Sequence, residues 1–118
     1  MMSALIVDDA EIVRVTLRII LTKNGYGVIH EASNGNEAIE LFKAHSPDLV
    51  TLDVTMDEVD GVVALKEIMQ INPKAKVLMV SAIGQDVVVK DSIKTGAGGF
   101  IVKPFTEQQI IEALNRLR

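Results

Sequence analysis

Short apolar runs alternate along the chain with longer stretches in which apolar residues recur at helical spacing. Residues 4–7, 49–52, 77–80 and 100–102 are apolar almost throughout, with Thr51 as the polar exception. Continuous apolar runs of this length predict strands that are buried on both faces of a parallel sheet. A fifth segment, residues 28–32, is more mixed and follows Gly25-Tyr26-Gly27. We expect that segment to be an edge strand.

The stretches between these runs have the spacing of amphipathic helices. We expect helices over residues 10–24, 36–44, 61–71 and 86–95, and a last helix that begins at Thr106. Thr106 and Gln109 fit a capping box at the start of that last helix. Strands that alternate with helices through short connections predict an α/β fold, a three-layer sandwich with a parallel sheet in the middle. With 118 residues and no linker or repeat, the chain is expected to form a single domain over residues 1–118.

Composition supports a globular protein whose core is aliphatic. Apolar residues make up 48% of the chain, charged residues 24% and aromatic residues 3%. The net charge of −4 argues against direct binding of nucleic acid, which a broad basic surface would favour. The chain has no cysteine, and no apolar run approaches the length of a signal peptide core or a membrane span. We therefore expect a cytoplasmic protein without membrane association.

Polar side chains follow each of the central strands. Asp8 and Asp9 come after the first apolar run, Asp53 after the run at 49–52, Ser81 after the run at 77–80, and Lys103 after the last run. In an open parallel sheet the binding site forms beyond the carboxyl ends of the strands, so these side chains are expected to meet at one edge.

This set of side chains suits the binding of a phosphoryl group. Clustered carboxylates repel one another unless a cation lies among them, and oxygen ligands favour Mg²⁺ or, by the same chemistry, Mn²⁺. The cation and the ammonium of Lys103 could neutralise phosphoryl oxygens while a carboxylate attacks phosphorus. Taken singly, Asp8-Asp9 and Ser81 could be helix caps, and Lys103 a surface charge. Their convergence on one edge favours the site.

The motifs themselves resemble a known family. LIVDD (residues 5–9), DLVTLD (48–53), VLMVSA (77–82) and FIVKPF (100–105) are similar, in order and spacing, to the motifs of CheY-like response regulator receiver domains. The resemblance runs from Ala4 to the last helix. It implies a flavodoxin-like sheet of five strands in the order 2-1-3-4-5, the order known for flavodoxin and CheY themselves.

The resemblance also implies roles for the acidic residues. Asp53 would be the phosphoacceptor. Asp9 and Asp53 would hold Mg²⁺ with side-chain oxygens, the backbone carbonyl of Thr55 would be a further ligand, and Asp8 would act mainly through a metal-bound water.

Further roles follow for the other residues at the same edge. Ser81 and the backbone amide of Ala82 would bind phosphoryl oxygens, and Lys103 would pair with the phosphoryl group. The peptide bond between Lys103 and Pro104 would be cis. Ser81 and Phe100 would form the switch that responds to phosphorylation.

Two features depart from the family pattern. The family commonly has Met-Pro after the acceptor strand, whereas this chain has Met56-Asp57, which puts the geometry of that loop in doubt. Gly98-Gly99 stand where the family often has polar residues, and we expect them to loosen the start of the last strand. Residues 81–85, Ser-Ala-Ile-Gly-Gln, resemble the version found in chemotaxis regulators.

The expected function is that of a phosphorylation switch. A histidine kinase would donate the phosphoryl group, and an output protein such as a flagellar motor switch component or another effector would read it. Ile12, Val15 and Ile19 form a second apolar face on the first helix, which we expect to contribute to kinase docking.

Output is expected on the face made by the fourth helix, the fifth strand and the fifth helix. In that fourth helix Val89 and Ile93 are expected to face the core, so that Val87 and Val88 add to the apolar surface. The chain would promote its own phosphorylation and dephosphorylation without being an enzyme for a separate substrate.

Three alternatives remain open. The chain ends at Arg118 without an output domain, so it would act through a partner, but it could be the receiver fragment of a longer regulator. A Mg²⁺-dependent phosphatase of the haloacid-dehalogenase type also uses an aspartyl phosphate, yet its acceptor follows a first strand and not a third. A flavodoxin-like carrier of FMN would need a phosphate-binding loop where Asp8 and Asp9 stand.

Overall fold

Strands and helices alternate from one end of the chain to the other. The structure is a computed structural model that describes residues 2–56 and 60–118. The elements are, in order, β1 (Met2–Val7), α1 (Glu11–Lys23), β2 (Tyr26–Ala32), α2 (Gly35–His45), β3 (Leu49–Leu52), α3 (Gly61–Ile71), β4 (Val77–Ser81), α4 (Asp86–Thr95), β5 (Gly99–Val102) and α5 (Glu107–Leu117). Every element that the sequence predicts is present, with ends that differ by at most two residues.

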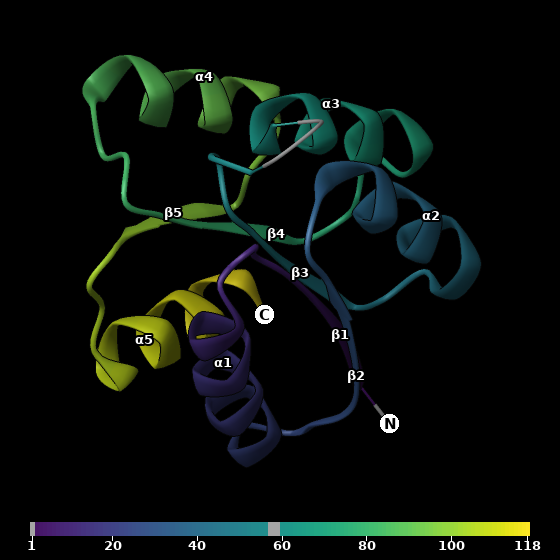
Figure 1. Cartoon of the computed structure of the whole chain (residues 1–118), viewed down its shortest axis with the longest axis vertical. Coiled ribbons are helices and arrows are strands. Elements are labelled where there is room, and N and C mark those ends of the chain that lie inside the picture. The colour runs from purple at the N-terminus through teal and green to yellow at the C-terminus, as the bar shows by residue number, and fades with distance from the viewer. Residues whose placement is uncertain (1, 57–59) are drawn as a thin grey trace.

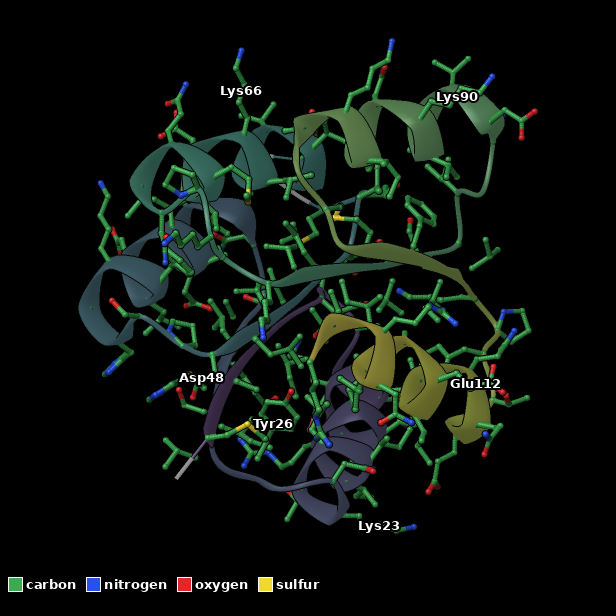
Figure 2. The ribbon with its side chains drawn as sticks, turned by 180° about the vertical axis from the view of Figure 1, so that it is seen from behind. Lys23, Tyr26, Asp48, Lys66, Lys90 and Glu112 are labelled. Carbon is green, nitrogen blue, oxygen red and sulfur yellow. The ribbon has the colours of Figure 1, made fainter. Side chains whose placement is uncertain are left out.

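The strands form one parallel sheet in the order β2-β1-β3-β4-β5. Helices α1 and α5 cover one face of this sheet, and α2, α3 and α4 cover the other (Figure 1). The three-layer α/β sandwich and the strand order expected from the family resemblance are therefore confirmed. Exposed charged residues such as Lys66, Lys90 and Glu112 project from the helices into solvent (Figure 2).

Each face of the sheet has its own apolar core. Leu5, Val50 and Met79 point toward the helices α2, α3 and α4, where Phe42, Leu65 and Ile68 meet them. Their strand neighbours Ala4, Ile6, Leu49, Leu78 and Val80 point the other way and pack against α1 and α5, on Leu17, Ile20, Ile110 and Leu114. Side chains of a strand alternate between the two faces, so a strand buried on both sides needs the continuous apolar runs seen in the sequence.

The two edges of the sheet are unlike its centre. β2 is an edge strand, as expected, and it begins at Tyr26, two residues earlier than predicted. β5 is the opposite edge strand, so the prediction that residues 100–102 are buried on both faces is wrong. Val102 is 45% exposed, because β5 lies at the edge of the sheet.

Helix α4 packs on the core with a different face from the one that the sequence predicts. Val88 packs against the core and Ser92 is fully buried, whereas Val87 is 69% exposed and Ile93 48% exposed. The hydroxyl of Ser92 donates a hydrogen bond to the carbonyl of Val88 at 2.9 Å. A serine satisfied within its own helix can be buried at little cost, which a hydropathy pattern does not reveal.

The last helix begins as its sequence indicates. The Thr106 side chain accepts a hydrogen bond from the amide of Gln109 at 3.2 Å, and the Gln109 side chain accepts one from the amide of Thr106 at 2.8 Å. This is the predicted capping box. In the part of the chain that the structure describes, no helix has both the length and the apolar character needed to cross a membrane.

The observed face of α4 can be tested by a matched pair of substitutions. Val88→Ser is expected to lower the free energy of unfolding by roughly 1 kcal/mol or more, because it removes a side chain that packs on the core. Ile93→Ser removes a half-exposed side chain from the same helix and is expected to change it by about 0.5 kcal/mol or less. Urea unfolding of both variants measures the difference, and the opposite ranking would contradict this orientation of α4.

Candidate functional site

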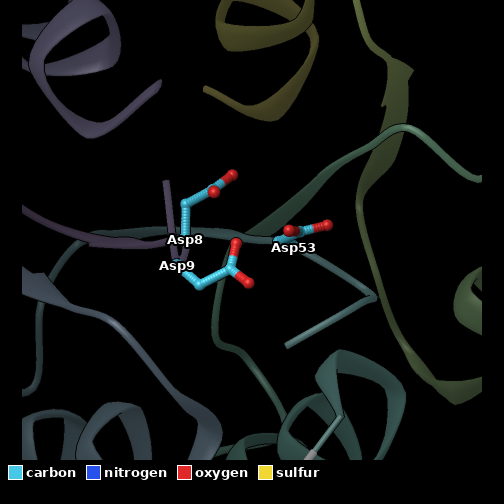
Figure 3. A group of neighbouring side chains, drawn as sticks. All are labelled: Asp8, Asp9 and Asp53. Carbon is cyan, nitrogen blue, oxygen red and sulfur yellow. The ribbon is translucent and has the colours of Figure 1, made fainter. Parts of the chain in front are cut away.

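The register of the central strands brings the acidic residues together. Val7 at the end of β1 pairs with Leu52 at the end of β3, so Asp8 and Asp53 leave the sheet side by side. The amide of Asp53 donates a hydrogen bond to the carbonyl of Val7 at 3.1 Å. Figure 3 shows the side chains of Asp8, Asp9 and Asp53 close together, and each offers an oxygen within 4.8 Å of the others. The predicted acidic cluster is therefore present.

The three carboxylates differ in their access to water. Asp8 and Asp53 are buried, with exposed fractions of 1% and 4%, whereas Asp9 is exposed. One oxygen of Asp8, Oδ1, accepts a hydrogen bond from the amide of Ala10 at 2.9 Å. Oδ1 of Asp53 accepts one from the amide of Thr55 at 3.3 Å. The buried pair is fixed by the backbone, and the exposed Asp9 faces the open side of the cluster.

Lys103 supplies the positive charge. Its amide donates to the carbonyl of Ser81 at 2.8 Å, which fixes the backbone of β5 beside the end of β4. Its Nζ lies 2.6 Å from Oδ2 of Asp8 and 3.5 Å from Oδ2 of Asp53. The peptide bond between Lys103 and Pro104 is cis, as the family resemblance implied.

The remaining predicted residues lie around this cluster. Ser81 is buried, and its hydroxyl oxygen accepts a hydrogen bond from the amide of Ile83 at 3.2 Å. Thr55 and Ala82 are exposed near the same edge. The roles expected for the Thr55 carbonyl and the Ala82 amide stay predictions. Phe100 is half-buried and packs against the core beneath α3 and α4. Its ring is therefore neither fully enclosed by the core nor fully exposed to solvent.

Burial and charge act against each other at Asp53. Burial raises the pKa of Asp53, and the neighbouring carboxylate of Asp8 raises it further. Lys103, Ser81 and the amide of Thr55 lower it, but they only partly offset the rise. Burial lowers the pKa of Lys103, yet its contacts with Asp8 and Asp53 outweigh burial and raise that pKa overall. The positive charge near Asp53 is thus too small to offset its burial and the carboxylate of Asp8.

The donor set fits a hard divalent cation. Three carboxylates converge, and Lys103 is the cation that pairs with two of them. The ionised cluster therefore carries an excess of negative charge, and its open side carries the exposed carboxylate of Asp9. Oxygen ligands with this charge suit Mg²⁺ or Mn²⁺ better than the softer metals that prefer sulfur and imidazole.

One residue of the site escaped the sequence analysis. A Cβ atom added to Gly61 would lie 1.8 Å from the carbonyl oxygen of Asp53, and the Gly61 amide donates to the carbonyl of Val54 at 2.7 Å. The start of α3 thus presses on the backbone that carries Asp53, and only glycine allows this approach. A glycine directly after Asp60, the N-cap residue of α3, is the signal that could have been noticed.

The two departures from the family pattern have different outcomes. Asp57 lies outside the described residues, so its effect on the loop stays a prediction. Gly98 is packed closely, because a Cβ atom there would lie 2.1 Å from Cδ2 of Leu117 at the end of α5. Its amide also donates to the carbonyl of Val77 at 2.8 Å. The glycine makes room for α5, and the looseness expected at the start of β5 remains untested.

Comparisons with known proteins agree with this geometry. Residues 4–115 match the model of the response regulator receiver domain. The chain is 54% identical over 112 residues to the chemotaxis protein CheY of Bacillus subtilis, which covers 95% of this chain and 93% of that protein. It is 52% identical over 113 residues to the chemotaxis protein CheY of Thermotoga maritima, covering 96% and 94%.

Solved structures give the same result. The CheX-CheY-BeF3-Mg+2 complex from Borrelia burgdorferi contains a chain that matches with a TM-score of 0.92 and 38% identity, over 96% of this chain and 86% of that one. The receiver domain of NtrX from Brucella abortus matches with a TM-score of 0.90 and 30% identity, over 98% and 97%. The family model and the relatives cover nearly the whole chain, and the acidic cluster lies at the expected edge of the sheet. The chain therefore belongs to the response regulator receiver family.

Proposed function

We propose that this receiver takes a phosphoryl group onto Asp53 from the phosphohistidine of a histidine kinase, in a reaction that requires Mg²⁺. The observation that carries the proposal is the buried Asp53 carboxylate, held between the carboxylates of Asp8 and Asp9 and the ammonium of Lys103. A carboxylate that is short of positive charge gains from a bound cation, and that cation together with Lys103 can neutralise the phosphoryl oxygens of an acyl phosphate formed on Asp53.

In the proposed transfer, one carboxylate oxygen of Asp53 forms a bond to phosphorus while the bond between phosphorus and the histidine nitrogen breaks. Lys103 moves its charge from the carboxylates to a phosphoryl oxygen, and the Ser81 hydroxyl donates a hydrogen bond to another. Asp9, Asp53 and the carbonyl of Thr55 would hold Mg²⁺ or Mn²⁺, with Asp8 acting through a water. When bound, the metal neutralises charge on the transferring group.

The reaction changes the chain itself and no separate substrate. We propose that the protein is a switch and not an enzyme in the usual sense, since it acts on its own Asp53. The phosphatase alternative finds no support, because the acceptor follows β3 and the two relatives at 54% and 52% identity are chemotaxis proteins. Those relatives favour a role in chemotaxis signalling. We propose that the protein acts in the cytoplasm.

A groove beside the site offers a docking place for the kinase. It has a volume of about 450 Å³ and runs between the start of α1 and the loop after β5, lined by Ile12, Val13, Thr16, Ala82, Lys103, Pro104 and Phe105. Ile12 is 72% exposed at its rim, and Val15 and Ile19 continue the apolar surface along α1. An apolar surface that adjoins Lys103 would bring a phosphohistidine close to Asp53.

The face formed by α4, β5 and α5 is the proposed output surface. Its exposed apolar residues are Val87 and Ile93 on α4 and Val102 on β5, so Ile93 replaces Val88 in the surface expected from the sequence. Ser81 is the last residue of β4, and Lys103 directly follows β5 beside this face. A Ser81 drawn toward a phosphoryl group would leave space into which the half-buried Phe100 could turn.

The partner is proposed to be an output protein such as a flagellar motor switch component or another effector. The Borrelia burgdorferi neighbour is a CheY in complex with CheX, with BeF3 and Mg+2. That complex supports a partner that binds when a phosphoryl mimic is present, although it concerns a different chain. Nucleic acid is not a proposed direct partner, in keeping with the net charge of −4.

Treatment with a small acyl phosphate and Mg²⁺ tests the proposed acceptor. The wild-type chain is expected to gain one phosphoryl group, and Asp53→Asn none, because the amide keeps the shape of the side chain but is not a nucleophile. Intact-mass spectrometry measures both. Asp91→Asn is the control, since it changes an exposed aspartate on α4 that is not part of the cluster. Full single phosphorylation of Asp53→Asn would show that the acceptor lies elsewhere.

Kinase docking is tested by comparing two phosphoryl donors, a histidine kinase and a small acyl phosphate that needs no docking surface. Ile12→Ser is expected to slow transfer from a cognate histidine kinase by roughly fivefold or more, since an exposed apolar contact at an interface is lost. Labelling by the acyl phosphate is expected to stay unchanged. Ile71→Ser is the control, because Ile71 is also an isoleucine in a helix, α3, and is 42% exposed. An equal loss with both donors would indicate damage to the fold and not to docking.

Beryllofluoride, which mimics a phosphoryl group, tests the switch. With Mg²⁺ it is expected to shift the amide NMR signals of residues 81–95 and 98–102, because both Ser81 and Phe100 respond. Asp53→Asn is expected to show no such shifts. Changes confined to the loops that hold Asp9, Asp53 and Lys103 would leave a phosphoryl-binding site without coupling to the output surface.

A further inference from the structure

Arg14 on α1 ties the turn after β1 to the edge strand β2. One end of its guanidinium, Nη1, donates a hydrogen bond to the backbone carbonyl of Asp8 at 2.7 Å. Its Nε donates to Oε1 of Glu31 on β2 at 3.1 Å. A planar guanidinium with both sides engaged is held in one orientation, which a flexible ammonium would not be. The side chain of Arg14 is 18% exposed, so the link is largely shielded from water.

Glu31 is itself held from two sides. Its second oxygen, Oε2, accepts a hydrogen bond from Nε of Arg18, one turn further along α1, at 2.8 Å. Although burial by itself raises the pKa of Glu31, the hydrogen bonds and charges of Arg18 and Arg14 lower it below its ordinary value. Glu31 therefore stays ionised at neutral pH and gives Arg14 a fixed, charged acceptor.

The carbonyl that Arg14 holds belongs to the peptide group joining Asp8 to Asp9. The amide of Asp8 is fixed by a hydrogen bond to the carbonyl of Ala32 at 3.1 Å, and its side chain is fixed by Ala10 and Lys103. Asp9 has no comparable support. Among the residues that the structure describes, none forms a hydrogen bond or ion pair with its exposed carboxylate. The backbone therefore fixes where the side chain of Asp9 begins, and no partner among the described residues holds its carboxylate.

We propose that Arg14 is a positioning residue for the metal site, which orients the peptide between Asp8 and Asp9 so that the Asp9 carboxylate faces Asp8 and Asp53. Glu31 holds Arg14 in place, and Arg18 supports Glu31. The inference rests on the proposed function, since it concerns how the acidic cluster binds Mg²⁺. Residues that orient metal ligands typically change metal affinity by about tenfold to a hundredfold when they are removed.

A role in general stability would give a different pattern. Both arginines contact Glu31, so loss of either would weaken the link between α1 and β2. The Arg18–Glu31 pair is the more exposed of the two, and an exposed ion pair contributes little to the stability of a fold. Only Arg14 reaches the Asp8 carbonyl, and Arg18→Met is therefore a matched control for Arg14→Met.

The dissociation constant for Mg²⁺, measured by isothermal titration calorimetry, is the first readout. Arg14→Met is expected to weaken Mg²⁺ binding by about tenfold, while Arg18→Met stays within about twofold of wild type. Asp9→Asn serves as the variant that lacks the ligand itself. If the wild-type chain does not bind Mg²⁺, the proposed function fails, and this outcome is distinct from equal affinities in wild type and Arg14→Met.

Two further readouts separate positioning from folding. In the metal-free protein, hydrogen exchange of the Asp8 and Ala10 amides is expected to quicken in Arg14→Met, while exchange in the central strands is unchanged. Acyl-phosphate labelling at saturating Mg²⁺ is expected to recover to within about threefold of wild type, because bound metal re-orders the Asp9 carboxylate. If Arg14→Met does not fold, Arg14→Lys keeps the charge without the planar fork and is expected to show the same loss of affinity. A folded Arg14 variant that binds Mg²⁺ as tightly as wild type, or equal losses in the Arg14 and Arg18 variants, would overturn the proposal.

Discussion

Repulsion between carboxylates at the carboxyl edge of the sheet is the constraint on which the rest of the site depends. Asp8 and Asp53 are both buried there, and Lys103 is the ammonium that contacts both of them. Burial and the charge of Asp8 raise the pKa of Asp53. That pKa is higher in the folded than in the unfolded chain. Ionisation of Asp53 therefore lowers the stability of the fold as the pH rises from the unfolded pKa through the folded pKa. A divalent cation relieves the same repulsion, so metal binding and stability are linked.

The fold holds these charges together through its backbone. Paired strand ends put Asp8 next to Asp53 and Ser81 next to the residue before Lys103. Gly61 lets the start of α3 press on the backbone of Asp53. The apolar layers on both faces of the sheet fix the strands, and thereby the edge, in a way that a surface loop could not. The strain of clustered charge is offset by packing elsewhere in the chain.

Much of this arrangement could be predicted from the sequence because parallel strands deliver whatever follows them to one edge. The acidic cluster, the position of Lys103 and the capping box at Thr106 follow from local patterns of this kind. The buried face of α4 could not be predicted, because Val88 and Ser92 are the inward residues and a buried serine breaks the hydropathy pattern.

Contacts between distant parts of the chain were also beyond sequence reasoning. The hydrogen bond from Arg14 to Asp8 depends on Glu31, seventeen positions further along the chain. Gly61 carries no chemistry of its own, and its importance appears only when the distance to Asp53 is known. Likewise, the exposure of Val102 follows from the place of β5 at the edge of the sheet, which apolarity alone does not give.

The titration of the Asp53 side chain, followed by ¹³C NMR of its carboxyl carbon with and without Mg²⁺, tests the electrostatic basis of the site most directly. Without metal, the pKa of Asp53 is expected to lie above the ordinary aspartate value, because burial and Asp8 disfavour the charged form. With saturating Mg²⁺ the same carboxyl is expected to titrate at lower pH, since the cation favours the charged form. A metal-free pKa of Asp53 at or below the ordinary value, unchanged by Mg²⁺, would contradict the claim that burial and Asp8 disfavour the charged form of the acceptor.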